Sequence, residues 1–379
     1  MVRNLTIIAM ALVLAGLIFF ALSFVSQQAV EEILPKAKRT SNRGLYITAW
    51  TAQTPSRLSY IKKQARAAGL NTIVVDAKAL LSKPVLEVVK TKKLTNQAKF
   101  GPNEWLAKLT KEFHEDGFIV TVRLVVFKDD HLVIARPDLG VKIEGGGLYR
   151  DLKWGRWADP YSDEVRLYNE LIAEIAALSG VDEVQFDYIR FPAERSSHKA
   201  IYPLKKEGVS KVDVINMFLA GVQKRLKKYN VSIAVDIFGV TAWQSKNDIE
   251  NIGQDLKKMA KYIDVLSPMF YPSHFHAGYD GFANPGSHPY YFVAKGVEKT
   301  KQILSGEVVA VVPWIQGFNL RSPNFGTNYI LEQVKACKDE SAEGYLIWNA
   351  SNKYEITFSA LKGKGVTATE DKATVTREE

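Results

Sequence analysis

Two aspartates close consecutive apolar runs in this sequence, and their placement makes them candidates for acid–base chemistry. Asp187 ends the run DEVQFD, and Asp236 ends the run VSIAVD. If these runs are neighbouring parallel strands, about 4.8 Å apart, both carboxyl groups meet at one edge of the sheet. At that range their interaction pushes the two pKa values apart, leaving one ionised nucleophile and one protonated acid. We therefore predict catalytic roles for Asp187 and Asp236, near the separation of about 5–5.5 Å needed to cleave a glycosidic bond with retention.

Other charged residues near these aspartates in the sequence allow alternative roles for them. Arg190 follows Asp187 by three residues, close enough to hold its carboxylate ionised, as a nucleophile requires. A purely structural ion pair of Asp187 with Arg190 or Arg123 at the rim is the competing interpretation. Glu194, in the segment after the same strand, is a second candidate for the acid/base role assigned to Asp236.

Further polar and aromatic side chains fall at the expected carboxyl ends of strands. Flat apolar rings stack on the C–H faces of sugars, so Trp50, Trp314 and Trp348 are candidate platforms. Asp76 either binds substrate or orients Lys78. We predict substrate contacts for ten residues: Trp50, Asp76, Tyr188, Arg190, Tyr271, His274, Trp314, Gln316, Trp348 and Asn349.

The sequence predicts neither a cofactor nor a metal site. His274 and His276 form the one close histidine pair, and no strand carries the HxH pattern of metal-dependent barrel hydrolases. A GxSxG nucleophile motif is absent. The single cysteine, Cys337, lies in a helical pattern, so the chain has neither a CxxC site nor an internal disulfide.

Eight short β-branched runs alternate with helical patterns and must position these side chains. They cover residues 44–50, 71–78, 118–127, 182–191, 231–240, 263–271, 308–318 and 344–351. Repeated strand–helix units imply a parallel sheet, because each return to a parallel strand needs a crossover helix. We predict an α/β fold, a (β/α)8 TIM barrel over residues 44–365. A doubly wound sheet is the alternative, but no GxGxxG loop follows the first strand. Long connections at 79–102, 128–161, 192–209 and 272–288 would build a cleft on one rim.

The two ends of the chain have a different composition from the barrel. Leu5–Val25 is an uncharged run that can span a hydrocarbon core of about 30 Å. Its length favours a retained membrane anchor over a cleaved signal. We therefore predict an anchor or signal segment over residues 1–30 and a polar linker over residues 31–43. The barrel is then expected to lie outside the cytoplasm. Residues 366–379 lack an apolar period and are expected to be disordered. The net charge of +9 is spread over helix faces, so we expect no nucleic-acid partner.

The segment VDEVQFDYIRFP, residues 181–192, resembles the signature of the putative glycoside hydrolase domain family. GLYITAW, ADPYSDEVR, VDIFG and SPMFYPSHF agree with the same family, and the resemblance covers about residues 44–350. It implies a TIM-barrel glycosidase, distantly similar to the alpha-amylase and related clans. The resemblance further implies that Asp187 is the nucleophile and that the acid/base lies on the fifth strand. That position is usually Glu, whereas here it is Asp236, one methylene shorter.

Two functions follow from these observations. The first is a retaining glycoside hydrolase acting on a cell-envelope or extracellular polysaccharide. The second is a non-catalytic carbohydrate-binding or envelope-assembly barrel. Carboxyl groups about 5–6 Å apart in an open cleft favour the first function, and carboxylates held by arginine favour the second.

Overall fold

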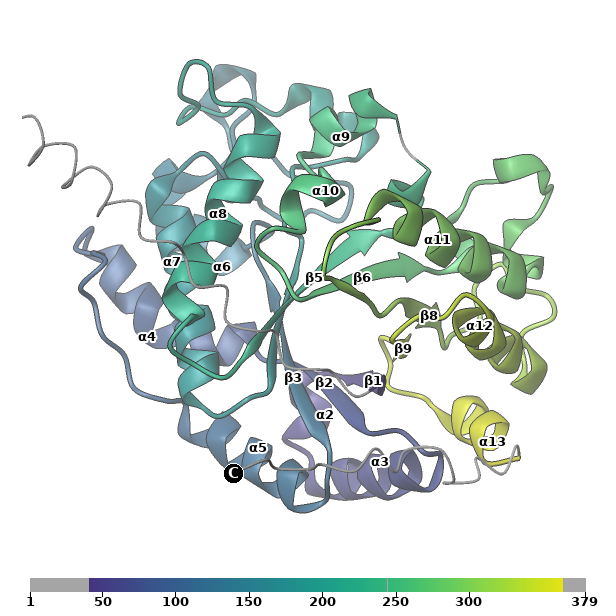
Figure 1. Ribbon diagram of the computed structural model, residues 1–379. Helices are drawn as coiled ribbons and strands as arrows, with labels where there is room; N and C mark the ends of the chain where they lie inside the picture. The colour runs from purple at the N-terminus through teal and green to yellow at the C-terminus, as the bar shows by residue number, and fades with distance from the viewer. Residues whose placement is uncertain (1–40, 244, 364–379) are drawn as a thin grey trace, which may run out of the picture. The chain divides into compact units, whose positions relative to one another are not determined.

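The computed structural model describes residues 41–363 except residue 244, and in this part the chain forms a closed parallel barrel (Figure 1). Its strands are β1 (Asn42–Ile47), β2 (Thr72–Asp76), β3 (Ile119–Val125), β4 (Glu183–Asp187), β5 (Ser232–Phe238), β6 (Val265–Phe270), β7 (Ala310–Val311), β8 (Trp314–Gln316) and β9 (Gly344–Trp348). β7 and β8 both pair with β6 and share one position, and β9 pairs with β1 to close the ring. The predicted (β/α)8 TIM barrel is confirmed.

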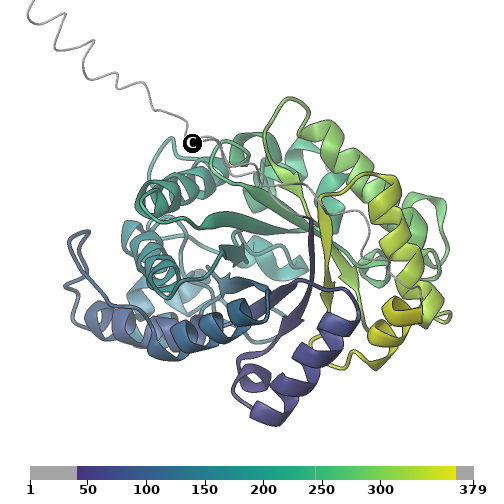
Figure 2. The same ribbon diagram turned by 60° about the horizontal axis from the view of Figure 1, so that its bottom comes forward.

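Helices surround the sheet on its outer side (Figure 2). The longer ones are α3 (Pro55–Ala67), α4 (Lys78–Lys90), α5 (Glu104–Glu115), α7 (Asp163–Leu178), α8 (Lys211–Leu226), α11 (Pro289–Ile303), α12 (Thr327–Asp339) and α13 (Glu355–Gly363). Shorter ones are α2 (Ala49–Ala52), α6 (Asp130–Ala135), α9 (Lys246–Ile252) and α10 (Leu256–Met259). Several begin where side chains satisfy free N–H groups: Asn103 accepts from Leu106, and Ser162 accepts from Val165.

Three elements differ from the sequence-based expectation. The first strand ends at Ile47, because the Thr48 side chain accepts a hydrogen bond from the Thr51 N–H and starts α2. The expected connection 79–102 contains α4 instead of a long loop. The helical pattern expected between the fifth and sixth runs is divided into α9 and α10, because Gly253 adopts a left-handed conformation with φ 81°.

Side chains on β3 and β4 alternate between the helix layer and the barrel interior. Val122 and Phe186 belong to the apolar core between sheet and helices. The intervening residues Arg123, Gln185 and Asp187 are polar and buried, and they point into the barrel. The interior beneath the site is therefore charged on this side, which requires partners for each group.

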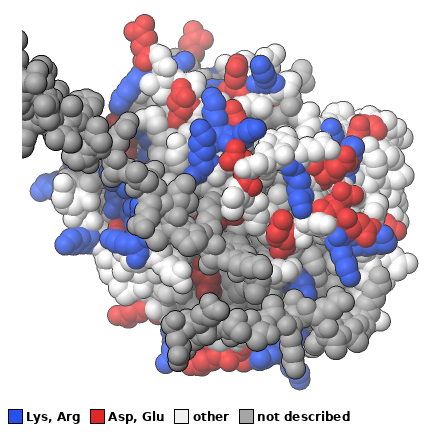
Figure 3. Space-filling model, viewed as in Figure 1, with Lys and Arg blue, Asp and Glu red and all other residues white. Residues whose placement is uncertain are grey.

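The expected segment 1–30, most of the linker and the tail 366–379 lie outside the described residues. Of the linker, Asn42 and Arg43 already belong to β1. Within residues 41–363 no helix is long and apolar enough to cross a membrane. On the face seen in Figure 3, acidic and basic side chains are interspersed over the helices.

Candidate active site

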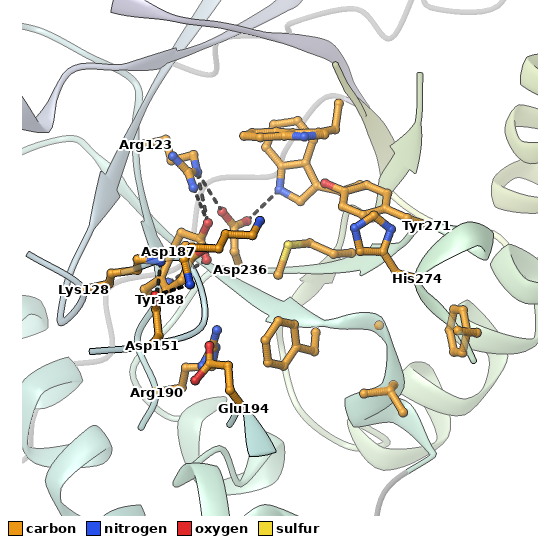
Figure 4. Close-up of a pocket in the computed structure, with 18 of the residues that line it drawn as sticks. Arg123, Lys128, Asp151, Asp187, Tyr188, Arg190, Glu194, Asp236, Tyr271 and His274 are labelled. Atoms are coloured by element: carbon orange, nitrogen blue, oxygen red, sulfur yellow. Dashed lines mark hydrogen bonds and ion pairs between the residues drawn. The ribbon is translucent and has the colours of Figure 1, made fainter. Parts of the chain in front are cut away.

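A cavity of about 550 Å³ opens at the carboxyl ends of the strands, where barrel enzymes place their reacting groups. Eight of the twelve predicted site residues line it: Asp187, Tyr188, Arg190, Asp236, Tyr271, His274, Trp314 and Trp348. Figure 4 shows the two aspartates side by side, with Arg123 above them and the rings of Tyr271 and His274 across the cavity.

Arg123 on β3 connects aspartates from three other strands. Its Nη1 donates to Asp76 Oδ2 over 2.7 Å, and its Nε donates to Asp187 Oδ2 over 3.1 Å. Its Nη2 also donates to Asp187 Oδ2, and its Nε lies 3.9 Å from Asp236 Oδ2. Burial lowers the pKa of Arg123, but the charges of Asp187, Asp76 and Asp236 outweigh burial and raise it above its usual value. The guanidinium is therefore a permanent positive charge beneath the cavity.

Asp236 on β5 is the more deeply buried carboxyl group of the pair, with 1% of its side chain exposed against 8% for Asp187. Burial and the charge of Asp187 raise the pKa of Asp236 well above its usual range, although Arg123 and a hydrogen bond from Trp314 lower it. The indole Nε1 of Trp314 donates to Asp236 Oδ1 over 2.7 Å. Because that N–H needs an acceptor, the proton of the neutral acid belongs on Oδ2.

Asp187 at the end of β4 is surrounded by donors. Besides the two guanidinium N–H groups, the backbone N–H of Tyr188 donates to its Oδ1 over 2.6 Å. Donors alone around both oxygens suit a carboxylate and leave no acceptor for a carboxylic acid proton. Tyr188 has φ 51°, a left-handed conformation that is unfavourable for a non-glycine residue and that concentrates at functional sites.

The separation of the two carboxyl groups is bounded by Arg123. Its Nε is 3.1 Å from Asp187 Oδ2 and 3.9 Å from Asp236 Oδ2, so these oxygens are at most about 7 Å apart. Phe186 pairs with Val235, which places the two aspartates at matching heights on adjacent strands. This bound is compatible with the spacing of about 5–5.5 Å for retention.

Arg190 does not fill the role expected from its sequence position, because Arg123 is the ion-pair partner of Asp187. The Arg190 guanidinium lies 4.1 Å from the ring centre of Phe238, and its Nη1 donates to its neighbour Phe191 O over 3.0 Å. Glu194 lies beside it in Figure 4 and also lines the cavity. The Glu194 Oε2 is buried and has no hydrogen-bond partner among the described residues.

Aromatic side chains, Trp314 and Trp348 among them, also line the cavity. The Trp348 ring stacks on Tyr46 with centroids 4.0 Å apart, and Trp314 meets Trp348 edge-on at 5.6 Å. Trp314 is only 1% exposed, so it closes the base of the cavity rather than offering a free ring face. Burial, followed by the charges of Arg321 and Lys153, lowers the pKa of His274.

Four predicted substrate contacts do not line the cavity. Trp50 lies on α2 with 69% of its surface exposed. Asp76 reaches the site only through Arg123. Gln316 donates to Phe318 O, and Asn349 donates to Gly317 O, so both side chains hold loops in place.

The connection from β3 to α7 brings into the cavity four residues that the sequence patterns did not indicate. Lys128, Asp151, Leu152 and Lys153 line it, and Lys128 Nζ lies 2.5 Å from Asp151 Oδ2. They lie outside any strand, so no periodicity marks them. A Cβ on Gly155 would lie 2.3 Å from Lys128 Cε, so a larger residue there would displace the end of the Lys128 side chain.

No metal centre is found in the described part of the chain, where no three His, Cys, Asp or Glu side chains are grouped suitably for an ion. Burial raises the pKa of the Cys337 thiol, as expected for an unreactive structural cysteine.

The sequence pattern of the family described as "putative glycosyl hydrolase domain" matches residues 44–354. No functionally curated protein matches the chain. A solved hypothetical protein from Ruminiclostridium thermocellum is 32% identical and covers 50% of this chain and 96% of its own, with a TM-score of 0.41.

Two more distant solved structures share the barrel. The PgaB (BpsB) glycoside hydrolase domain from Bordetella bronchiseptica is 13% identical, with a TM-score of 0.58 and coverage of 86% of this chain and 98% of its own. A beta-galactosidase from the psychrophilic Marinomonas ef1 is 13% identical, with a TM-score of 0.53 and coverage of 81% and 54%. At this identity the likeness shows the fold alone.

Proposed function

Because the chain belongs to the family of putative glycosyl hydrolase domains, we propose that its barrel cleaves glycosidic bonds of a polysaccharide with retention of configuration. Asp187 is the nucleophile and Asp236 the acid/base. The observation that supports this proposal is two adjacent carboxyl groups in one cavity with opposite environments. Three N–H groups hold Asp187 as a carboxylate, whereas burial and that charge keep Asp236 protonated.

In the first step, a carboxylate oxygen of Asp187 attacks the anomeric carbon while Asp236 Oδ2 gives its proton to the leaving oxygen. The bond from the anomeric carbon to that oxygen breaks, and a glycosyl ester of Asp187 forms. In the second step, Asp236 takes a proton from water, the water oxygen attacks the anomeric carbon, and the ester bond breaks. Both carboxyl groups return to their starting protonation states.

The surrounding charges favour the transition state of both steps. With Asp236 neutral, Arg123 balances only one of the two carboxylates Asp76 and Asp187. The cluster of Arg123, Asp76, Asp187 and the neutral Asp236 then carries a net charge of −1. A buried negative charge stabilises the positive charge that develops on the sugar ring.

Azide rescue assigns the two roles. The full-length protein is screened against a polysaccharide panel with reducing-end detection, and an aryl glycoside of the responsive sugar serves as substrate. Azide should rescue Asp187→Ala with an azide product of inverted configuration, because azide replaces the missing nucleophile. It should rescue Asp236→Ala with retained configuration, because azide attacks the glycosyl ester.

The same assay tests Glu194 as the alternative acid/base. If Glu194→Ala gives the retained azide product and Asp236→Ala does not, the proton donor is Glu194. Wild-type protein that releases product with inverted configuration would overturn the retaining mechanism.

The contact between Arg123 and Asp187 favours a second candidate, a non-catalytic carbohydrate-binding barrel. An arginine-held carboxylate is the arrangement expected of that function. Binding of an oligosaccharide without any release of reducing ends, in wild type and in Asp187→Asn alike, would establish binding in place of hydrolysis.

We also propose that the barrel is exposed outside the cytoplasm by a membrane anchor in residues 1–30. The uncharged run Leu5–Val25 supports this proposal. An intact N-terminus in the membrane fraction, with protease accessibility from outside, is the expected result. A mature protein beginning near residues 27–30 would show cleavage and secretion instead.

A further inference from the structure

The segment Asp151–Gly155 forms a turn at the rim of the cavity, and interactions of the Asp151 carboxylate hold its conformation. Asp151 Oδ1 accepts from the backbone N–H groups of Lys153 and Gly155, each over 2.9 Å. Asp151 Oδ2 accepts from Trp157 Nε1 over 3.2 Å and lies 2.5 Å from Lys128 Nζ. One buried carboxylate thus fixes the turn from both sides.

This fixed turn presents apolar and basic side chains to solvent instead of burying them. Leu152 is 70% exposed and Trp154 is 75% exposed, and Trp154 has φ 62°. Leu152 and Lys153 line the cavity itself. Exposed large apolar groups on a rigid turn next to a cavity are typical of a binding surface.

Lys153 is the one solvent-exposed cation among the residues that line the cavity, and it has no carboxylate partner among the described residues. Arg123 binds Asp187 and Lys128 binds Asp151. Arg190 also lacks an ion pair with a carboxylate in the described part of the chain, but it is buried against aromatic rings. The ammonium of Lys153 acts electrostatically on His274, which enters the cavity from the connection after β6. Lys153 and His274 both line the cavity, which they reach from different connections.

Building on the proposed hydrolase function, we propose that the substrate is an anionic polysaccharide and that Lys153 binds a carboxylate or other acidic substituent of a sugar in the cavity. The neighbouring His274 donates or accepts a hydrogen bond to the same sugar. Trp154 stacks on the next sugar outside the cavity. An unpaired ammonium beside a cavity gains a partner only when such a group binds.

The experiment uses the full-length protein and oligosaccharides of equal length. The anionic set contains oligogalacturonate, oligomannuronate and glucuronate-containing oligomers. The neutral set contains xylo-, cello- and chito-oligomers. Binding is measured by calorimetry and hydrolysis by reducing-end release. Lys153→Glu and Lys153→Gln are compared with Lys63→Glu, which makes the same charge change on an exposed face of α3. Lys63 does not line the cavity.

At least one anionic oligomer should bind more tightly than every neutral one. Lys153→Gln should weaken that binding about tenfold, the worth of one charge-assisted hydrogen bond, and Lys153→Glu should weaken it further. Lys63→Glu should change it by less than about twofold. Trp154→Ala should weaken binding of long but not short oligomers, with an unchanged melting temperature.

The outcomes separate this inference from the proposed function. Hydrolysis of a neutral oligomer that Lys153→Glu leaves unchanged overturns the anionic substrate while retaining the hydrolase. Tight, Lys153-dependent binding of an anionic oligomer that is never cleaved supports the anionic site and overturns the hydrolase. If no anionic oligomer binds, or if Lys63→Glu weakens binding as much as Lys153→Glu, the inference is wrong.

Discussion

Replacing Asp187 with asparagine keeps its shape and removes the charge that both Arg123 and the proposed chemistry require. If Asp187 is the nucleophile, kcat should fall at least about a thousandfold, which corresponds to about 4 kcal/mol of transition-state stabilisation. Binding of an oligosaccharide should persist, because the walls of the cavity are unchanged. Burst kinetics and reducing-end release measure the loss of activity.

The stability cost of Asp187→Asn follows from the contacts of Arg123. Asparagine still accepts one hydrogen bond from the guanidinium, but the charged partner is lost, a cost of about 1–3 kcal/mol. Asp76 remains bound to Arg123. Removal of the Asp187 charge also lowers the pKa of Asp236, which can then ionise and replace that charge. The cost should therefore lie at the lower end, as measured by chemical denaturation.

Asp76→Asn is the matched control, because it makes the same chemical change to another partner of Arg123 at a position outside the cavity. The Asp76 side chain is 30% exposed, so its loss should cost about 1 kcal/mol or less. Its effect on kcat should stay within about tenfold. Equal losses of activity in Asp76→Asn and Asp187→Asn would refute the nucleophile, since both residues would then act only by holding Arg123. A fully active Asp187→Asn would refute it as well.

Three further predictions follow from burial and from the hydrogen bond of Trp314 to Asp236. Trp314→Ala should cost about 3–5 kcal/mol in denaturant titration, because the ring is buried. Trp314→Phe keeps an aromatic ring but removes the hydrogen bond that lowers the pKa of Asp236. It should therefore move the basic limb of the pH–rate profile to higher pH, and an unmoved limb would exclude Asp236 as the acid. Burial raises the pKa of Asp159 to about 6, above its value in the unfolded chain, so its contribution to stability is full below about pH 4 and is lost as the pH rises to about 6. Asp159→Asn should therefore gain about 3 kcal/mol relative to wild type between those pH values, and parallel pH–stability curves would contradict this.

The barrel and its two central aspartates were predictable from the sequence for a physical reason. Strands buried on both faces read as apolar runs, and the first polar residue at the end of a run marks the edge where side chains meet. Asp187 is the last residue of β4, whereas Asp236 lies two residues before the end of β5, and adjacent positions on neighbouring strands bring them together. The starts of α3 at Pro55 and of α7 after Ser162 are also determined by nearby residues, because proline geometry and side-chain capping act within one helical turn.

The tertiary structure alone decided which partner each charge has and which rings face the cavity. Arg123 precedes Asp187 by 64 residues, and only the barrel register selects it over the sequence neighbour Arg190. The hydrogen bond from the Thr51 N–H to the Thr48 side chain starts α2 within the run expected to be a strand. Trp50 therefore lies on a helix and does not line the cavity. Lys153 lies at the rim of the cavity because the buried carboxylate of Asp151 holds the turn that contains it. No periodic pattern in the sequence indicates this turn. Local periodicity specifies elements, whereas long-range pairing of charges in a low-dielectric interior specifies the chemistry of the site.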